Sequence, residues 1–423
     1  MNILYLTMTR FGDGSGHNVH LDLMRKFRQE GHEVYVVFPI ERGLALTPSG
    51  NVETHGRASS WRKVKGGMLL EYDRMHILAV RTLRLQKANI VEKGIGQLMV
   101  GRLYQRAFER CFGRVKFDLI TYSTPPITLV GMVKWAKKRN PQAMTYLQLK
   151  DIFPQNAVDM GMLSTHGIKG ILYRRFRRME CELYGVSDWI GCMSPANVRY
   201  LVEHNPNVCP DRVEICPNSM EVPVCRDAPA HVSMGVRQKY GLPEDRPLIL
   251  YGGNLGKPQG IPFLIECLKA NCERDDCHFV IVGNGVDYPL LEQWCATSHP
   301  LNVTLLQRLP IADYDELVAS CDVGLIFLDY RFTIPNYPSR LLNCLLAHKP
   351  VIACTDPNCD TGTIAESNGY GFYCPSNSVN HFTQTLDRML RSDIKAMGER
   401  GYQFFLENYT VECSYGAIMR HLL

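Results

Sequence analysis

Two glycine-rich loops have residue types that could hold a phosphate group. Gly14, Ser15 and Gly16 follow the apolar run of residues 2–7, and a second loop, residues 252–260 (GGNLGKPQG), follows the apolar run 247–251. Glycine lets a backbone approach a phosphate closely, and the amides at a helix N-terminus favour negative charge. Neither loop has the full spacing of a dinucleotide-binding or NTPase fingerprint, so plain turn geometry remains the alternative for residues 14–16.

A second polar segment follows later in the chain. Ser339 lies between Pro338 and a predicted helix over 340–347, which makes it a candidate N-cap. The free amides of such a helix could bind a diphosphate or a sugar hydroxyl, and a simple capped helix is the alternative. Asp313 and Asp315 spell the DxD pattern of some metal sites, but they stand where a helix begins, so helix capping is the favoured interpretation.

The elements that would position these residues alternate between strand and helix. Residues 2–7 predict a buried strand, 19–30 a helix and 33–38 the next strand, and the same opening recurs over 247–282. Strands joined by helical crossovers pair in parallel. We therefore expect an α/β chain with two doubly wound, Rossmann-like domains. Further predicted strands cover 119–122, 145–149, 189–193, 323–328 and 350–353.

The irregular stretch 221–232 contains Pro223 and Pro229 and is the expected linker. We predict a first domain over 1–225 and a second over 226–400. Residues 401–423 predict a C-terminal helix that packs back on the first domain.

Composition excludes several classes of protein. The chain has 423 residues, 45% hydrophobic and 21% charged, as expected for a folded protein with more than one core. We expect no secretory signal, because the apolar start is short, and no spanning helix, because no window approaches about 18 apolar residues. The 16 cysteines are scattered without CxxC pairs, which favours reduced thiols over zinc or disulfide sites.

Charge is divided unevenly between the halves. Residues 1–225 carry 31 basic and 20 acidic side chains, whereas 226–423 carry 16 and 22, so the first half is expected to face something anionic. Two basic clusters stand out, one at Arg102, Arg106, Arg110 and Arg114 with an apolar face beside it, the other at Arg174, Arg175, Arg177 and Arg178. Basic amphipathic helices bind anionic membranes. A solvated arginine face is the ordinary alternative, and no nucleic-acid reader motif is present.

Several segments resemble the retaining family 4 glycosyltransferases with the GT-B fold. In the second half these are 251–260 (YGGNLGKPQG), 282–285 (VGNG), 315–322 (DELVASCD) and 338–352 (PSRLLNCLLAHKPVI). In the first half, 151–155 (DIFPQ) resembles an Asp-Leu-Trp-Pro-Glu segment of the fucosamine-transferase branch of O-antigen and capsule pathways. Residues 215–219 (ICPNS) resemble the Ile-Pro-Asn-Gly segment before the domain crossover. The resemblance covers nearly the whole chain in the expected order.

The resemblance implies a nucleotide-sugar held mainly by the C-terminal domain, an acceptor held mainly by the N-terminal domain, and neither metal nor cofactor. In such enzymes the leaving phosphate is thought to take the acceptor proton, so the protein contributes positioning and electrostatics. Asp151 is then the candidate catalytic residue, which would orient the acceptor or ease charge at the anomeric carbon; an N-cap or turn aspartate is the alternative. His17 could reach the same site, although a core or surface histidine is more common.

The chain departs from the family at the diphosphate clamp. The usual Arg and Lys correspond to Asn254 and Gln259, with Lys257 between them, and the glutamate that holds the donor ribose corresponds to Asn343. Neutral amides still donate hydrogen bonds, without charge assistance. The predicted nucleotide-sugar-binding residues are Gly14, Ser15, Gly16, Gly253, Asn254, Lys257, Gln259, Gly260, Pro338, Ser339, Arg340 and Asn343.

The sequence thus predicts a transferase that moves a sugar, such as an N-acetylated deoxyhexosamine, from a UDP-sugar. The expected acceptor is an undecaprenyl-diphosphate-linked oligosaccharide of a bacterial surface polysaccharide. The enzyme would be cytoplasmic, bound peripherally to the anionic inner face of the cell membrane. Two alternatives stay open: a UDP-sugar 2-epimerase on the same fold, and a non-catalytic GT-B assembly partner.

Overall fold

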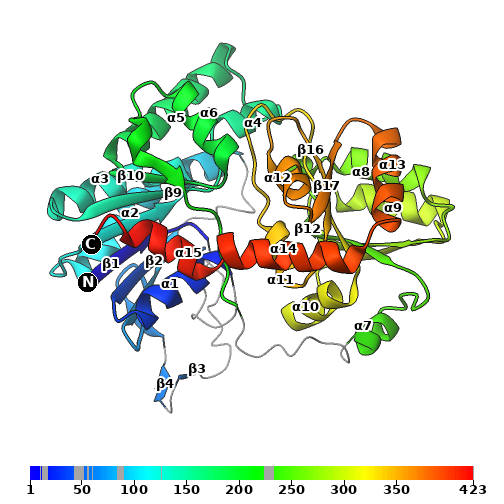
Figure 1. The fold of residues 1–423 in the computed structure, drawn as a ribbon. Coiled ribbons are helices and arrows are strands. Elements are labelled where there is room, and N and C mark those ends of the chain that lie inside the picture. The colour runs from blue at the N-terminus through cyan, green and yellow to red at the C-terminus, as the bar shows by residue number, and fades with distance from the viewer. Residues whose placement is uncertain are drawn as a thin grey trace. The chain divides into compact units, whose positions relative to one another are not determined.

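A computed structural model describes residues 1–9, 11, 18–41, 52–54, 57–59, 61–82, 90–124, 126–222 and 233–422. The chain forms two compact units. Unit 1 comprises Met1–Glu221 and Val411–Leu423, and unit 2 comprises Val222–Thr410. Each unit is an α/β layer structure with helices on its sheet (Figure 1).

The sheet of unit 1 has nine strands in the order β11-β10-β9-β8-β1-β2-β7-β6-β5. The strands from β11 to β7 pair in parallel, and β6 and β5 add an antiparallel edge. The order reverses between β1 and β8, which is where ligands bind in open α/β sheets. The bounds are β1 (Asn2–Leu6), β2 (Glu33–Glu41), β5 (Arg62–Val64), β6 (Gly67–Tyr72), β7 (Met75–Thr82), β8 (Leu119–Ser123), β9 (Met144–Leu149), β10 (Trp189–Cys192) and β11 (Val213–Ile215), with β3 (Val52–Thr54) and β4 (Arg57–Ser59) as a separate hairpin.

The first helix of unit 1 shows how local sequence sets the elements. Asn18 caps α1 (Val19–Gln29) by accepting the amides of His20 and Leu21. The apolar face of α1, including Met24 and Phe27, is buried. The other helices of this unit are α2 (Ile90–Phe112), η1 (Ile127–Leu129), α3 (Val130–Arg139), α4 (Gln155–Asp159), α5 (Gly167–Val186), α6 (Pro195–His204), η2 (Pro210–Arg212) and α15 (Val411–Met419).

The sheet of unit 2 is parallel throughout, in the order β14-β13-β12-β15-β16-β17. This is the strand order of a dinucleotide-binding fold, with the reversal between β12 and β15. The strands are β12 (Leu248–Asn254), β13 (His278–Asn284), β14 (Val303–Leu306), β15 (Val323–Phe327), β16 (Val351–Thr355) and β17 (Gly371–Pro375). The helices are α7 (Ser233–Lys239), η3 (Lys257–Gln259), α8 (Ile261–Ala270), α9 (Tyr288–Ser298), α10 (Ile311–Ser320), α11 (Arg340–Leu346), α12 (Thr361–Ser367), α13 (Val379–Leu390) and α14 (Ile394–Asn408).

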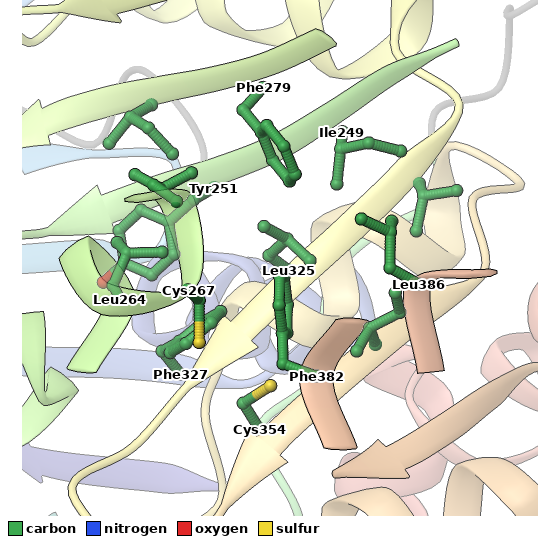
Figure 2. Close-up of a cluster of buried hydrophobic side chains, with 14 of the residues drawn as sticks. Ile249, Tyr251, Leu264, Cys267, Phe279, Leu325, Phe327, Cys354, Phe382 and Leu386 are labelled. Carbon is green, nitrogen blue, oxygen red and sulfur yellow. The ribbon is translucent and has the colours of Figure 1, made fainter. Parts of the chain in front are cut away.

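A dry core lies on one face of this sheet. Figure 2 shows side chains of β12, β13, β15 and β16 meeting those of α8 and α13. Tyr251 and Phe327 on the strands pack there with Phe382 of α13, and all three are fully buried. This core fixes the carboxyl ends of β12 and β15, where the second glycine loop begins.

The second unit ends at Thr410, later than the predicted domain boundary at residue 400. Helix α14 belongs to unit 2, because Gly398 lies against the backbone of His348 and Phe404 packs on Tyr370. The chain returns to unit 1 only at Val411, where α15 packs on α1 through the Phe27–Tyr415 ring contact. The predicted class, two doubly wound parallel-sheet domains, is confirmed.

Candidate functional site

The second glycine loop begins at the reversal point of the unit 2 sheet. Gly253 has a φ of 132°, a backbone angle that residues with a side chain rarely adopt. It lies opposite Gly283 of β13, where an added Cβ would come within 1.9 Å of the Gly253 carbonyl oxygen. These glycines allow two strand ends to approach closely, and residues Gly253 and Asn254 are exposed there.

The rest of the loop is held against its neighbours. The buried Leu255 donates its amide to Asn284, and Asp329, just after β15, donates its amide to Pro258. Gly260 has a φ of 61° and lies against the Asp329 backbone, so only glycine fits both the conformation and the space. The loop is therefore fixed by hydrogen bonds to the ends of β13 and β15.

Arg340 places a cation beside this loop. Its guanidinium lies over the Tyr251 ring, with Cζ 4.8 Å from the ring centroid. The same guanidinium borders Gly253, where an added Cβ would be 3.6 Å from Arg340 Cζ. Its Nη1 is buried and has no hydrogen-bond partner among the described residues. A buried guanidinium nitrogen without an acceptor is costly, and an anion would satisfy it.

The two amides predicted to contact the diphosphate bond to each other. Asn254 Nδ2 donates to Gln259 Oε1 at 2.8 Å. One Nδ2 hydrogen of Asn254 is used in this bond, so the pair keeps the other Nδ2 hydrogen and the two on Gln259 Nε2, fewer donors than the sequence suggests. Lys257 is exposed at the start of η3.

Helix α11 carries the last group of predicted residues. Ser339 is the N-cap residue as predicted, but its φ and ψ angles are helical and its side chain makes no capping hydrogen bond. Pro338 precedes it, and Asn343 lies three residues after Arg340, on the same helix face. Arg340, rather than the helix terminus, is thus the feature of α11 that favours an anion.

In the Asp-Tyr-Asp segment (residues 313–315), the Asp313 side chain bonds to residues near the end of α7. The expected capping role of Asp313 is wrong, because Pro310 is the N-cap residue of α10. Asp313 instead accepts hydrogen bonds from Lys239, at 2.6 Å, and from the Tyr240 hydroxyl. No group of three metal-ligating side chains occurs in the described part of the chain.

In unit 1, Asp151 follows β9 and is neither an N-cap nor a free turn residue. The N-cap residue of α4 is Pro154. Asp151 Oδ2 accepts from Asn156 Nδ2 at 2.8 Å, and its backbone oxygen accepts from Thr124. Burial raises the pKa of Asp151 to about 6, with the Asn156 hydrogen bond acting in the opposite direction. Gly14, Ser15, Gly16 and His17 lie outside the described residues.

A polar cluster that was not predicted from the sequence lies at the reversal point of unit 1. It consists of Tyr5 on β1, His20 on α1, Ser123 on β8 and Lys150 after β9. The available signal was that Ser123 and Lys150 stand at carboxyl ends of strands, where ligands bind. Their proximity depends on strand order, which single segments do not reveal.

The basic clusters differ in how their helices pack. Helix α2 buries its apolar face, including Tyr104 and Phe108, against unit 1, so Arg102, Arg106 and Arg110 form a solvated arginine face. The described part of this helix therefore favours the alternative interpretation, a solvated arginine face packed on the core.

Helix α5 leaves apolar residues uncovered. Ile168, Ile171 and Leu172, on one face, are 88%, 63% and 41% exposed. Arg174, Arg175 and Arg178 are also exposed. Arg177 is not available for lipid, because it holds Glu180 at 2.7 Å and donates to the carbonyl of His204. Within the described ranges, no helix is long and apolar enough to cross a bilayer.

The loop glycines give a test of this geometry. An added Cβ at Gly285 would lie 2.1 Å from the Leu255 carbonyl oxygen, so Gly285→Ala must displace the loop backbone. We expect a loss of about 3 kcal/mol in the free energy of unfolding, measured by urea denaturation. Gly235→Ala is the matched control, because nothing lies near that glycine within α7 and alanine favours helix by about 1 kcal/mol. Equal stability of the two variants would contradict the loop packing.

Comparison with known proteins agrees with this architecture. Residues 235–404 match the family model described as "Glycosyl transferases group 1". The "Probable glycosyltransferase WbjE" of Pseudomonas aeruginosa is 23% identical over 285 residues, which cover 66% of this chain and 68% of that protein. The "Putative colanic acid biosynthesis glycosyl transferase WcaI" of Escherichia coli (strain K12) is 29% identical over 136 residues, 31% of this chain and 32% of that protein.

A solved structure extends the likeness to the whole fold. Anabaena HepE in complex with UDP superposes with a TM-score of 0.66 at 16% identity, covering 100% of this chain and 99% of that chain. The predicted GT-B fold is confirmed. The comparisons support a glycosyltransferase, and residues 235–404 of the second unit match the group 1 model.

Proposed function

We propose that the protein transfers a sugar from a UDP-sugar to a lipid-linked acceptor during synthesis of a bacterial surface polysaccharide. The observation that carries the donor assignment is the buried, unpartnered Nη1 of Arg340 beside the Gly253 turn. A diphosphate at the reversal point of the unit 2 sheet would supply the missing acceptor oxygens.

Arg340 would take the role that the family's Arg and Lys have at positions 254 and 259. The backbone amides of the loop and Gln259 Nε2 would add neutral donors, and Asn343 would face the ribose from the same side of α11. Fixed donors aimed at a departing diphosphate stabilise its charge without reorganisation. This arrangement gives a leaving-group site that needs no metal ion.

Asp151 is the proposed acceptor-orienting residue of unit 1. Its carboxyl lies at the end of β9, and its raised pKa of about 6 leaves it mostly ionised at neutral pH. It could then accept a hydrogen bond from an acceptor hydroxyl. The name of one similar protein, the "Putative colanic acid biosynthesis glycosyl transferase WcaI", favours a polysaccharide pathway. An N-acetylated deoxyhexosamine remains our proposed donor sugar.

Calorimetric titration of the whole chain with UDP and with GDP tests the donor assignment. We expect UDP to bind with unchanged affinity in the presence of EDTA and to raise the unfolding temperature, since a ligand of the folded state stabilises it. A chain that binds neither nucleotide would instead be a non-catalytic assembly partner. That alternative is favoured by the Asn254–Gln259 bond and by Asn343 in place of a glutamate.

We further propose that the exposed face of α5 binds the anionic inner surface of the cell membrane, with the protein cytoplasmic. Ile168, Ile171 and Leu172 would enter the headgroup layer, with the arginines beside them. Each basic residue near such a surface contributes about 1 kcal/mol. This surface would bring a lipid-linked acceptor to unit 1, which also carries Asp151.

Replacing Arg174, Arg175 and Arg178 by glutamine should weaken binding to phosphatidylglycerol-containing vesicles by roughly a hundredfold, from the loss of about 3 kcal/mol. Co-sedimentation measures this. The charge-matched control replaces Lys269, Arg391 and Lys395, which are exposed in unit 2. Equal sedimentation of both triple variants would contradict the proposal. Arg177 is left intact because its bond to Glu180 supports the helix.

A further inference from the structure

The polar cluster of unit 1 joins residues from four separate elements. Tyr5 of β1 and Ser123 of β8 lie on the two strands at which the sheet order reverses, and their hydroxyl oxygens are 3.3 Å apart. Lys150 reaches the same place from the end of β9, with Nζ 3.4 Å from His20 Nδ1. Lys150 and His20 both keep partial exposure, so a ligand can reach them.

The neighbours of His20 favour one tautomer. An ammonium can only donate, so the approach of Lys150 Nζ to Nδ1 favours a neutral imidazole with Nδ1 as the acceptor. Nε2 then carries the proton and donates to the Thr9 hydroxyl at 3.3 Å. Burial, and then the charge of Lys150, lower the pKa of His20 well below its usual value, consistent with this tautomer.

Lys150 has no carboxylate partner in this cluster. The neighbouring Asp151 turns its carboxyl to Asn156, and no ion pair joins Lys150 to any described acidic group. The other titratable groups that face it are neutral: His20, Tyr5 and the thiol of Cys216, whose pKa burial raises to about 11. Burial also lowers the pKa of Lys150 to about 7. A half-buried amine among neutral groups is a vacant counter-ion position for an anion.

We propose that Lys150 forms an anion-binding subsite of unit 1, which holds a phosphate group of the acceptor. The assignment to the acceptor rests on the proposed function, because unit 2 would hold the diphosphate of the donor. Tyr5, His20 and Ser123 position the amine, and Lys150 donates to the phosphate oxygens.

Such a subsite couples anion binding to proton uptake. An anion beside Lys150 favours the ammonium form, so the bound lysine holds its proton to a higher pH than the free one. Near neutrality, part of the free protein must therefore take up a proton on binding. Above the pKa of the free amine, the advantage that Lys150 gives should decline with pH.

The experiment titrates inorganic pyrophosphate into the full chain saturated with UDP, by calorimetry at several pH values. We expect Lys150→Met to bind pyrophosphate about thirtyfold more weakly than the wild type at pH 6.5, and less than about threefold more weakly at pH 8.5. Titration in two buffers of different ionisation enthalpy should show more proton uptake by the wild type than by Lys150→Met, whose titration gives the protons that pyrophosphate itself exchanges. Lys134→Met is the matched control, since Lys134 of unit 1 is exposed and paired with Glu182.

The outcomes separate the two sources of phosphate. Unchanged UDP affinity in Lys150→Met supports the acceptor assignment, whereas a parallel loss of UDP affinity overturns it. Equal pyrophosphate binding by wild type and Lys150→Met, or no binding by either, overturns the subsite. Failure of the wild type to bind UDP would contradict the proposed donor site instead. The subsite can still be tested then, by titrating pyrophosphate without UDP into chains that carry Arg340→Met.

Discussion

Arg340→Met is expected to lower the affinity for UDP about a hundredfold, which corresponds to about 3 kcal/mol. The guanidinium that borders Gly253 has one buried nitrogen without an acceptor, and the diphosphate would be its partner. For the same reason the variant should not lose stability in the absence of ligand, because methionine removes an unsatisfied buried donor. Calorimetry with UDP and thermal unfolding without it check the two halves of this prediction.

Two further variants sharpen the test of Arg340. Arg340→Lys keeps the charge but loses the planar fork that stacks on Tyr251, so we expect intermediate affinity. Arg331→Met is the matched control from the segment between β15 and α11, because Arg331 is already held by both Asp329 oxygens at 2.9 and 2.8 Å. A loss of UDP affinity in Arg331→Met equal to that in Arg340→Met would contradict the specific role of Arg340.

Lys150→Met is expected to stabilise the protein at neutral pH by about 3 kcal/mol. The pKa of Lys150 is about 7 in the folded chain and 10.5 in its ordinary environment, a difference worth about 5 kcal/mol at full coupling, reduced by partial solvent access. Between these values the unfolded chain binds more protons, so wild-type stability rises with pH across the window. The gain from methionine should therefore shrink to less than about 1 kcal/mol near pH 10.

Urea denaturation at pH 7 and pH 10 measures this effect. Lys134→Met should change stability by less than about 1 kcal/mol at both pH values, because its ion pair with Glu182 is at the surface. A variant that is more stable yet binds anions more weakly is the pattern expected where function keeps a costly charge in place. Lower stability of Lys150→Met at pH 7 would show that the amine supports the fold rather than a ligand.

Sequence patterns were most informative where local chemistry decides the structure. Helix α8 lies within the strand–helix–strand opening predicted over 247–282, because Gly260 ends the loop in the left-handed region and Pro262 suits a first turn. The antiparallel edge of unit 1 was missed. Its β6–β7 turn uses Asp73 and Arg74, with φ values of 38° and 61°, instead of the glycine that usually marks such a turn.

The candidate site was predicted only in part, because packing between elements decides the rest of it. Arg340 and the loop glycines were found from their order in the chain, but the guanidinium over Tyr251 results from packing between α11 and β12. The side chains of Asn254 and Gln259 bond to each other, and Asp313 pairs with Lys239. The sequence does not show that these side chains are already engaged with partners. Tyr5 and Lys150 are 145 positions apart, and only the strand order brings them to one edge.

The central claim is that unit 2 holds a nucleotide diphosphate at the turn after β12 with Arg340 as its cation. The most direct measurement is a crystal structure of the full chain with UDP. It should place diphosphate oxygens at hydrogen-bond distance, about 3 Å, from Arg340 Nη1 and from a backbone amide of the 253–260 loop. A diphosphate bound elsewhere, with Arg340 still unpartnered, would contradict the account.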